Sequence, residues 1–319
     1  MSIILNEYER YLIECELTLT PFPEDAEGAI TMDDLINPLL QIKTSDVYLR
    51  NHETSSFSIV KSKMIEDRYL MLLIQAANGR RASDPAFSKL KTGESRTVHK
   101  EIDEGVAVSV HLMIDTQARD KLFPNKYLAI LEEIPGLTRG VVAEILTHFT
   151  KGLNFSFVRK SNGNSIGCRP IFKLDFYASQ TFEESFKNGY LCSITATRST
   201  RLKGMDVNGA EVVEEHKLVI KPKRTTKELA LQTLAKASQL FKDKGYSKLK
   251  IVRSENSRKT STDYDIPDNL DNYDNAVQDL SQATFAKKHR VKLAAKISSC
   301  QNNFHTDLEN KMLSLIKES

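Results

Sequence analysis

The sequence predicts an α+β protein with two domains and a long C-terminal helix. From Ile171 to Val252 the chain reads strand, helix, strand, strand, helix, strand, a ferredoxin-like alternation found in many α+β domains. From about residue 275 to 317 apolar residues recur in near-helical register, which at about 1.5 Å per residue would build a helix of roughly 60 Å. A helix of that length overhangs a small domain, so we expect it to pack along a second chain. The expected regions are an acidic α+β domain over 1–152, a basic α+β domain over 153–260, and an Asp-rich linker with a dimerisation helix over 261–319.

The first domain is expected to consist mainly of strands. Tyr11–Thr20 alternates apolar and polar residues and is followed by Pro21-Phe22-Pro23, which predicts a strand that ends there. Tyr69–Ala77 is the most apolar run of the chain and fits either a buried strand or a buried helix, because periodicity alone does not separate the two. The other expected elements are a helix at Leu35–Ile42, paired strands at Asp46–Arg50 and Ser56–Lys61, a loop at Asn78–Ser95, a hairpin formed by Arg96–Asp103 and Val106–Ile114, and a helix within Arg139–Phe149.

The second domain is organised around the stretch Glu215–Lys259. Thr225 and Glu228 have the spacing of a capping box, which predicts that a helix starts there, and Gly245 is expected to end it. The expected order is a strand at His216–Ile220, the basic turn Lys221-Pro222-Lys223-Arg224, a helix with Ala230, Leu234, Ala237 and Phe241 on one face, and a return strand at Ser247–Val252.

Charge is distributed unevenly along the chain. The formal net charge is only +3, from 45 basic and 42 acidic side chains. Between Ala196 and Thr260 there are 16 basic and 7 acidic residues, a local net of +9, whereas residues 1–60 hold 3 basic and 11 acidic residues, a net of −8. Residues 261–280 contain six aspartates and no basic residue. Positive charge concentrated on one supersecondary unit is typical of a protein with a polyanionic partner.

Several protein classes find no support in the sequence. No apolar run approaches the roughly 18 residues of a transmembrane helix, and the N-terminus lacks the basic-then-apolar order of a signal peptide. Four scattered cysteines without a CxxC pair indicate reduced thiols in the cytoplasm. The seven histidines show no metal-ligand spacing, and no Walker-type loop, G-x-G-x-x-G or G-x-S-x-G motif is present. We therefore expect no metal, cofactor or small-molecule substrate.

The basic turn and its neighbours form the candidate nucleic-acid site. Lys221, Lys223 and Arg224 lie in the turn itself and are expected to contact phosphates. Lysines predominate and no aromatic residue is interleaved with them, which favours contact with the phosphate backbone over stacking on bases. The alternative is a solvated face of an ordinary soluble domain. The residues expected to support the turn are Lys217, Lys227, Arg253, Arg258 and Lys259.

A second basic cluster spans Lys287–Lys292 on the expected long helix. It is a weaker candidate for nucleic-acid contact, because consecutive charges wrap around a helix instead of sharing one face.

Two further classes remain as alternatives. Glu215-His216-Lys217 resembles the E-x-K motif of metal-dependent nucleases, with Asp206 as an upstream carboxylate. In such enzymes the motif lies within a strand, whereas here it precedes the apolar run, and a match of this length is common by chance. The other alternative is a protein-interaction subunit whose basic face meets an acidic protein.

One segment resembles a known family. The run LVIKPKRTTKE at residues 218–228 resembles the strand, basic Ile-Lys-Pro-Lys turn and helix of RexA-like phage exclusion proteins from lambdoid prophages. Weaker similarities are the Leu39-Leu40 helix end, the Val-Tyr-Leu hairpin at residues 47–49 and an amphipathic C-terminal helix. The chain departs from the family in the Asp-rich segment 261–280 and in a longer C-terminus.

The resemblance implies a set of properties. RexA-like proteins are homodimeric, two-domain α+β proteins related in fold to the recombination-associated protein RdgC. They bind DNA with little sequence preference, opening between their domains is thought to admit the duplex, and they act in phage exclusion, often beside a membrane partner. The family's basic turn corresponds to Lys221, Lys223 and Arg224. We therefore expect a cytoplasmic, non-enzymatic homodimer that binds duplex DNA without sequence preference and acts in phage exclusion, abortive infection or another form of antiviral defence, or in prophage control.

Overall fold

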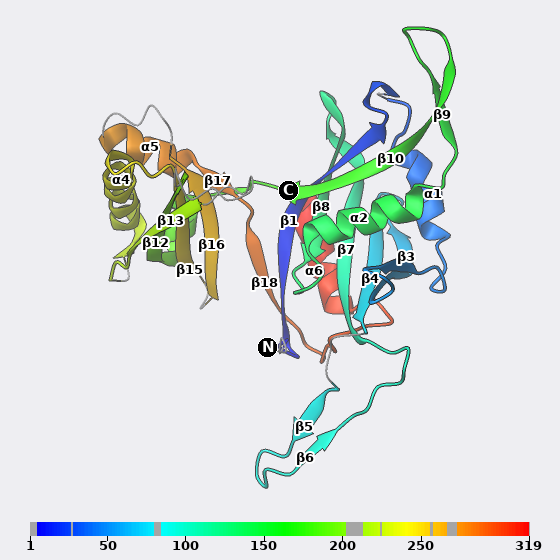
Figure 1. The fold of residues 1–319 in the computed structure, drawn as a ribbon, viewed down its shortest axis with the longest axis horizontal. Coiled ribbons are helices and arrows are strands. Elements are labelled where there is room, and N and C mark those ends of the chain that lie inside the picture. Colours follow the sequence, from blue (N-terminus) through cyan, green and yellow to red (C-terminus); the bar gives the residue numbers. More distant parts are fainter. Residues whose placement is uncertain are drawn as a thin grey trace. The chain divides into compact units, whose positions relative to one another are not determined.

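The computed structural model divides into two compact units. The first takes Met1–Tyr177 and Lys288–Ser319, and the second takes Ala178–Lys287 (Figure 1). The chain therefore leaves the first unit once and returns to it near its C-terminus. The structure describes residues 5–26, 28–79, 84–201, 213–223, 225–255, 258–266 and 273–318.

The first unit is built on one large antiparallel sheet. Its described strands follow the order β2-β3-β4-β7-β8-β1-β10-β9, with β18 also paired to β1. The long strand β1 pairs with β8 along one edge and with both β18 and β10 along the other. The strands are β1 (Glu9–Phe22), β2 (Tyr48–Arg50), β3 (Ser55–Ile65), β4 (Tyr69–Asn78), β7 (Val106–Asp120), β8 (Phe123–Glu132), β9 (Phe155–Val158), β10 (Ser165–Phe176) and β18 (Lys288–Lys292).

Helices lie on both faces of this sheet. A short 3-10 turn, η1 (Glu24–Ala26), follows β1, and α1 (Asp33–Leu40) neighbours α2 (Arg139–Thr150). The α2 helix packs on β10, where the Phe172 backbone N–H donates to the Thr147 hydroxyl at 3.0 Å. On the other face, α6 (Thr306–Glu318) buries Leu308, Met312, Leu315 and Ile316 against side chains of β1, β4, β7, β8 and β18.

A buried ion network holds the C-terminal segment on the sheet. One oxygen of Glu132 meets Arg10 at 3.0 Å and the other accepts from His111 Nδ1 at 2.6 Å, and all three side chains are buried. His111 Nε2 accepts the backbone N–H of His305 at 3.1 Å, and Arg10 donates to the Ser298 carbonyl at 3.2 Å. Burial lowers the pKa of Arg10, and the Glu132 carboxylate opposes that effect.

A narrow two-stranded hairpin leaves the sheet between β4 and β7, and we call residues 84–104 the arm (Figure 1). Its strands are β5 (Ala86–Ser88) and β6 (Ser95–Thr97). The sequence predicts a loop over Asn78–Ser95 and a hairpin between Arg96–Asp103 and Val106–Ile114. Instead, β6 pairs with β5 and β7 pairs with β4.

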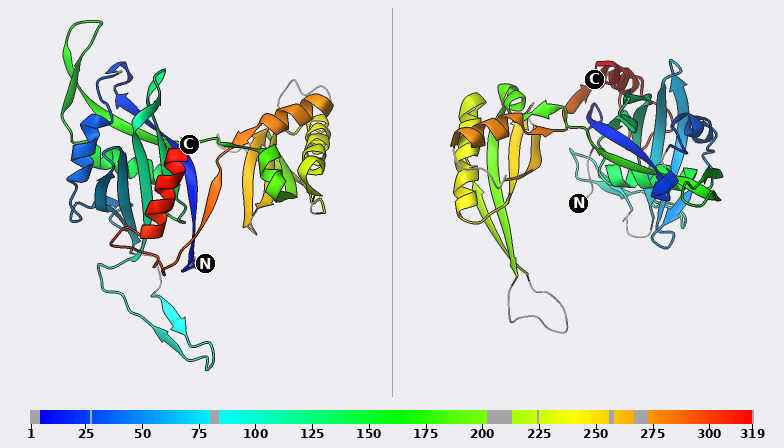
Figure 2. Two further views of the ribbon diagram at one scale, coloured as in Figure 1. Left: turned by 180° about the vertical axis from the view of Figure 1, so that it is seen from behind. Right: turned by 90° about the horizontal axis from the view of Figure 1, so that it is seen from above.

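The second unit is a smaller antiparallel sheet with helices on one face (Figure 2). The described strands follow the order β13-β12-β15-β16, and β14 pairs with β12. Phe186, Leu234, Phe241 and Leu280 from the three helices share one core with the strands, for example with Ile251. The elements are β11 (Gln180–Thr181), α3 (Phe182–Asn188), β12 (Gly189–Arg201), β13 (Val213–Ile220), β14 (Thr225–Thr226), α4 (Lys227–Asp243), β15 (Lys248–Glu255), β16 (Arg258–Asp265), α5 (Tyr273–Gln282) and β17 (Thr284–Phe285).

The predicted fold class was wrong. Of the described residues, 47% lie in strands and 23% in helices, so this part of the chain is mostly β. The ferredoxin-like alternation fails because its first strand, β10, belongs to the sheet of the first unit. The sequence order was read correctly there, but local order does not say which sheet a strand joins. The observed units also have different limits from the predicted 1–152, 153–260 and 261–319.

The predicted long C-terminal helix was also wrong. The segment from about residue 275 to 317 contains most of α5, the strands β17 and β18, and α6, which spans 13 residues. Lys288, His289 and Arg290 lie in β18, which pairs with β1, and carboxylates of the first unit meet all three side chains. Glu133 meets Lys288 at 2.6 Å, Glu14 meets His289 at 2.5 Å, and Glu9 meets Arg290. These partners are about 155 to 281 residues away in sequence, so no local pattern reveals them. Among the described helices, none is long and apolar enough to cross a bilayer.

Candidate nucleic-acid interface

The sheet of the second unit turns one face toward its helices and the other toward solvent. On β15, Leu249, Ile251 and Arg253 are buried on the helical side. Side chains alternate across a strand, so Lys248 and Lys250 lie on the opposite side, and both are exposed. We call that opposite side the open face.

The open face gathers four lysines around small polar residues, and we call them the lysine face. In the register of the sheet, Thr197 on β12 lies between Lys217 on β13 and Lys248 on β15. One row further, Thr195 lies next to Lys250, and Lys259 on β16 lies opposite Ser254, two rows beyond Lys250. The members of the lysine face are Lys217, Lys248, Lys250 and Lys259, and each is exposed.

The sheet fixes the spacing of these lysines. Lys248 and Lys250 are two residues apart on one strand, so their Cα atoms are separated by about 6.8 Å. Lys217 and Lys248 are two strands apart, a separation of about 10 Å between Cα atoms. Flexible lysine stems allow each ammonium group to reach several phosphate positions. The arrangement suits contact with a nucleic-acid backbone, because it offers several cations at once without demanding one fixed geometry.

Carboxylates partly neutralise the lysine face. Glu215 meets Lys217 at 2.7 Å, and Asp265 meets Lys248 at 3.9 Å. Asp263 lies opposite Lys250 in the register of β15 and β16. The Glu215–Lys217 and Asp265–Lys248 pairs have side chains at least half exposed, so each is worth about 1 kcal/mol or less and is screened by salt. A polyanion can therefore replace these carboxylates as partner of the lysines.

The structure places the predicted residues in several positions. Lys217 and Lys259 belong to the lysine face, and Lys221 and Lys223 are exposed in the turn that follows β13. Arg224 lies outside the described residues, and so do the side chains of Lys227 and Arg258, whose backbones begin α4 and β16.

Arg253 does not belong to this surface. Its side chain is 4% exposed and lies over the Phe285 ring, with the guanidinium carbon 3.5 Å from the ring centroid and 5.8 Å from that of Phe182. It donates to the Thr262 hydroxyl at 2.6 Å, whereas its Nε has no hydrogen-bond partner among the residues that the structure describes. Desolvation lowers the pKa of Arg253 to about 10, and Glu255 opposes that effect. Burial thus removes Arg253 from the predicted set and makes it a packing residue of the second unit.

Lys248 and Lys250 were not among the residues predicted from the sequence. Both lie in a segment that was expected to be a strand, and Lys-Leu-Lys-Ile-Val places its two lysines on the face opposite Leu249 and Ile251. This alternation is a signal that could have identified them. It could not have shown that the lysine side is free of helices, because that depends on how α3, α4 and α5 pack.

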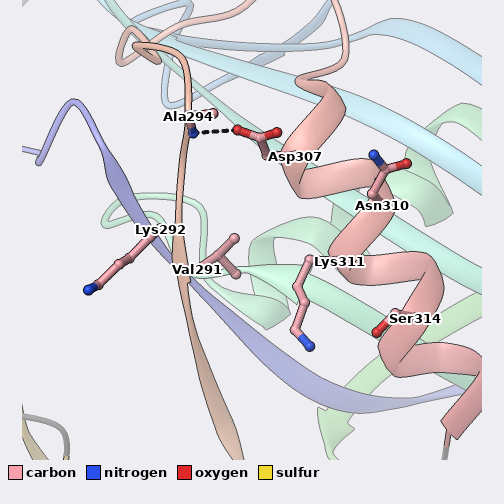
Figure 3. A pocket seen from close by; sticks show the side chains of 7 residues that line it. All are labelled: Val291, Lys292, Ala294, Asp307, Asn310, Lys311 and Ser314. Carbon is pink, nitrogen blue, oxygen red and sulfur yellow. Dashed lines mark hydrogen bonds between the residues drawn. The ribbon is translucent and has the colours of Figure 1, made fainter.

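Three residues of the second basic cluster, Lys288, His289 and Arg290, pair with carboxylates of the first unit, as described above. Beside it, β18 and α6 border a groove of about 390 Å³, in which Figure 3 shows Val291 between the stems of Lys292 and Lys311. Asp307 accepts the backbone N–H of Ala294 at 2.6 Å there. The groove is lined by Val291, Lys292, Ala294, Asp307, Asn310, Lys311 and Ser314.

The residues of the nuclease alternative are only partly placed. Glu215 and Lys217 lie within β13, which is the strand context that an E-x-K motif requires, and not before the strand as the sequence suggested. Their 2.7 Å ion pair joins them directly. Asp206 lies outside the described residues. In the part of the chain that the structure describes, no three or more His, Cys, Asp or Glu side chains gather as a metal site would require.

Comparisons with models of protein families, with curated proteins and with solved structures found no match for this chain.

Proposed function

We propose that this protein binds duplex DNA without sequence preference through its lysine face, and that it is not an enzyme. The observation that carries the proposal is the placement of Lys217, Lys248, Lys250 and Lys259 on one side of a sheet whose described helices pack on the other side. The exposed Lys221 and Lys223 continue the positive charge beyond the end of β13. Phosphate contacts of this kind supply affinity without reading sequence.

The chemistry of the open face favours a duplex over a single strand. Sheets that bind single strands use aromatic side chains in their central strands as stacking platforms. Here the corresponding positions of β12 and β15 hold Thr195, Thr197, Lys248 and Lys250. Among the described strand residues, alternation puts an aromatic on this side only at Tyr190, opposite Ser254 at the end of the face. Hydroxyls and ammonium groups contact phosphates well but give bases nothing to stack on.

The biological role that we propose rests on resemblance. The LVIKPKRTTKE run covers the end of β13, the basic turn and the start of α4, next to the lysine face. By analogy with RexA-like proteins, we propose a cytoplasmic homodimer in phage exclusion, abortive infection or prophage control, acting beside a membrane-protein partner. The α6 helix is not proposed as its dimer element, because its apolar side chains are buried within the first unit.

A gel-shift comparison tests the lysine face. The Lys248→Glu/Lys250→Glu and Lys221→Glu/Lys223→Glu double variants should each bind a duplex of arbitrary sequence at least tenfold more weakly than wild type. Lys236→Glu is the matched control, because Lys236 is an exposed lysine on α4, on the helical side of the sheet. Unchanged affinity in both double variants, or an equal loss in the control, would show that the lysine face is not the binding surface.

The nuclease alternative is kept because Glu215 and Lys217 share one side of a strand. Incubating supercoiled plasmid with the protein and Mg²⁺ or Mn²⁺ decides it: nicking that Glu215→Gln abolishes would establish an enzyme, and intact plasmid would support the binding protein. The acidic-protein alternative predicts no affinity for DNA, and so no linear fall of log affinity with log salt.

A further inference from the structure

The arm of the first unit exposes more apolar surface than its size explains. Phe87 is 56% exposed, and Leu90 and Ile102 are as exposed as in an extended chain, at 103% and 108%. Single exposed apolar residues are common, but several on one projecting hairpin mark a surface that meets a partner. The positions of the charged residues along the arm indicate which partner that is.

The tip of the arm is a defined turn. Two backbone hydrogen bonds close it, from Lys89 N–H to the Glu94 carbonyl at 2.8 Å and from Gly93 N–H to the Lys89 carbonyl at 2.9 Å. Gly93 has φ +74°, a conformation that glycine adopts without strain. The Ser88 hydroxyl also donates to the Gly93 carbonyl at 3.2 Å. Leu90 is the first residue of this closed turn and projects from it into solvent.

Charge separates the two ends of the arm. Leu90 at the tip stands between Lys89 and Lys91, and Arg96 lies over the Phe87 ring at 5.2 Å. The pair between Lys89 and Glu94 is at least 66% exposed on both sides, so a phosphate can readily displace the carboxylate. From Ala86 to Thr97 the sequence has three basic residues and one acidic residue.

Ile102, near the root of the arm, has the opposite surroundings. It stands between Glu101 and Asp103, with Glu104 next in sequence, and is exposed to the same extent as Leu90. A polyanion would be repelled at this position and attracted at the tip.

We propose that the arm tip enters a groove of duplex DNA, with Leu90 inserted as an apolar wedge between neighbouring base pairs and Lys89 and Lys91 on the flanking phosphates. A two-stranded ribbon is narrow enough for a groove, and proteins that bend DNA insert leucine and similar side chains between base steps. This inference rests on the proposed DNA binding and adds a second contact to it. It assigns distortion of the duplex to the first unit and electrostatic affinity to the lysine face.

Two readouts on the full-length protein test the wedge separately from binding. Gel shift measures affinity, and a duplex containing 2-aminopurine reports unstacking, because this base fluoresces more strongly when its neighbour is displaced. Wild type should bind the duplex and raise the fluorescence. Leu90→Ala should abolish the rise and weaken binding about threefold to tenfold, with an unchanged dependence of affinity on salt, because an apolar contact releases no counterion.

Ile102→Ala is the matched control, since it removes an equally exposed apolar side chain from the same arm. It should leave both readouts at the wild-type level. Lys91→Ala should lower the salt dependence by about one phosphate contact while keeping part of the fluorescence rise. An equal effect of Leu90→Ala and Ile102→Ala would overturn the wedge, because it would point to a general role of the apolar arm in folding or self-association.

The remaining outcomes separate this inference from the proposed function. Binding that depends on Lys248 and Lys250 but leaves 2-aminopurine unchanged would refute the wedge and keep the lysine face. A Leu90-dependent fluorescence rise with no loss in the Lys248→Glu/Lys250→Glu variant would support the arm and refute the lysine face. Leu90-dependent binding to vesicles of anionic phospholipid, with no fluorescence change on DNA, would assign the tip to a membrane surface and overturn the proposal.

Discussion

Replacing Lys248 and Lys250 by alanine should weaken the dependence of DNA affinity on salt. Each lysine that neutralises a phosphate releases condensed counterions, so log affinity falls with log salt with a slope of about −0.9 per contact. If the four members of the lysine face each meet one phosphate, they contribute about −3.6 to the slope. Between about 50 and about 200 mM salt this contribution alone should lower the affinity of wild type about 150-fold.

The double variant keeps Lys217 and Lys259, so the lysine face retains two contacts. The contribution of this face to the slope should fall to about −1.8, which lowers affinity about twelvefold over the same salt range. The geometry makes these two lysines a sensitive pair, because they lie about 6.8 Å apart on one strand and point the same way. Fluorescence anisotropy of a labelled duplex at five or six salt concentrations measures both slopes.

The control for this experiment is Lys236→Ala, which removes one positive charge from α4 on the helical side. Its slope should equal that of wild type even if the lower net charge reduces affinity slightly at low salt. A double variant with the wild-type slope would refute the reasoning, because it would mean that no phosphate is bound at Lys248 or Lys250. A reduced slope in Lys236→Ala would show that charge alone, and not its position, controls binding.

Three further predictions concern side chains that the structure places in particular surroundings. Asp263→Asn/Asp265→Asn should strengthen duplex binding severalfold at an unchanged salt slope, as measured by the same anisotropy titration, because two competing carboxylates leave the open face while the number of phosphate contacts stays the same. Arg253→Met should change the free energy of unfolding in urea by about 1 kcal/mol or less. Burial of the charge lowers the pKa of Arg253 to about 10 and costs about 3 kcal/mol, and this cost offsets most of what its aromatic contacts contribute to stability. A loss of several kcal/mol would show that the buried charge is strongly stabilising. Glu132→Gln should destabilise the first unit by about 3 to 5 kcal/mol in urea unfolding, because Arg10 would remain buried without a counter-charge, and an unchanged midpoint would contradict this.

Local patterns predicted many of the individual elements. The alternation in Tyr11–Thr20 marks β1, and the paired strands expected at Asp46–Arg50 and Ser56–Lys61 correspond to β2 and β3. The apolar run Tyr69–Ala77, which fitted a strand or a helix, is the strand β4. It is buried on both faces, and this is the situation in which a strand loses its alternation.

The capping-box pattern occurs at two places in the sequence of the second unit, and only one of them caps a helix in this way. The capping box expected at Thr225 is not formed, because Thr225 lies in β14 and α4 begins two residues later with Thr226 as its N-cap. The full capping box of this unit occurs at Thr181 and Glu184, at the start of α3. Hydroxyl and carboxyl residues at this spacing are common, so tertiary pairing decides which of them starts a helix.

In the candidate site, too, the sequence shows which residue types are present, and the tertiary structure decides which of them share a surface. The excess of positive charge in residues 196–260 is visible in the sequence and indicates a polyanionic partner. Which of those cations face solvent together is not visible. Arg253 belongs to the same basic stretch as Lys248 and Lys250, and only the packing of Phe182 and Phe285 turns it inward.

The sequence by itself determined where strands start, where charge gathers and where a turn must form, because these depend on neighbouring residues. The tertiary structure alone decided which strands share a sheet. It joined β18 to β1 across more than half of the chain and divided the segment that reads as one long helix. Hydrogen bonds and ion pairs between distant segments stabilise those arrangements, and periodicity within a short window carries no record of such partners.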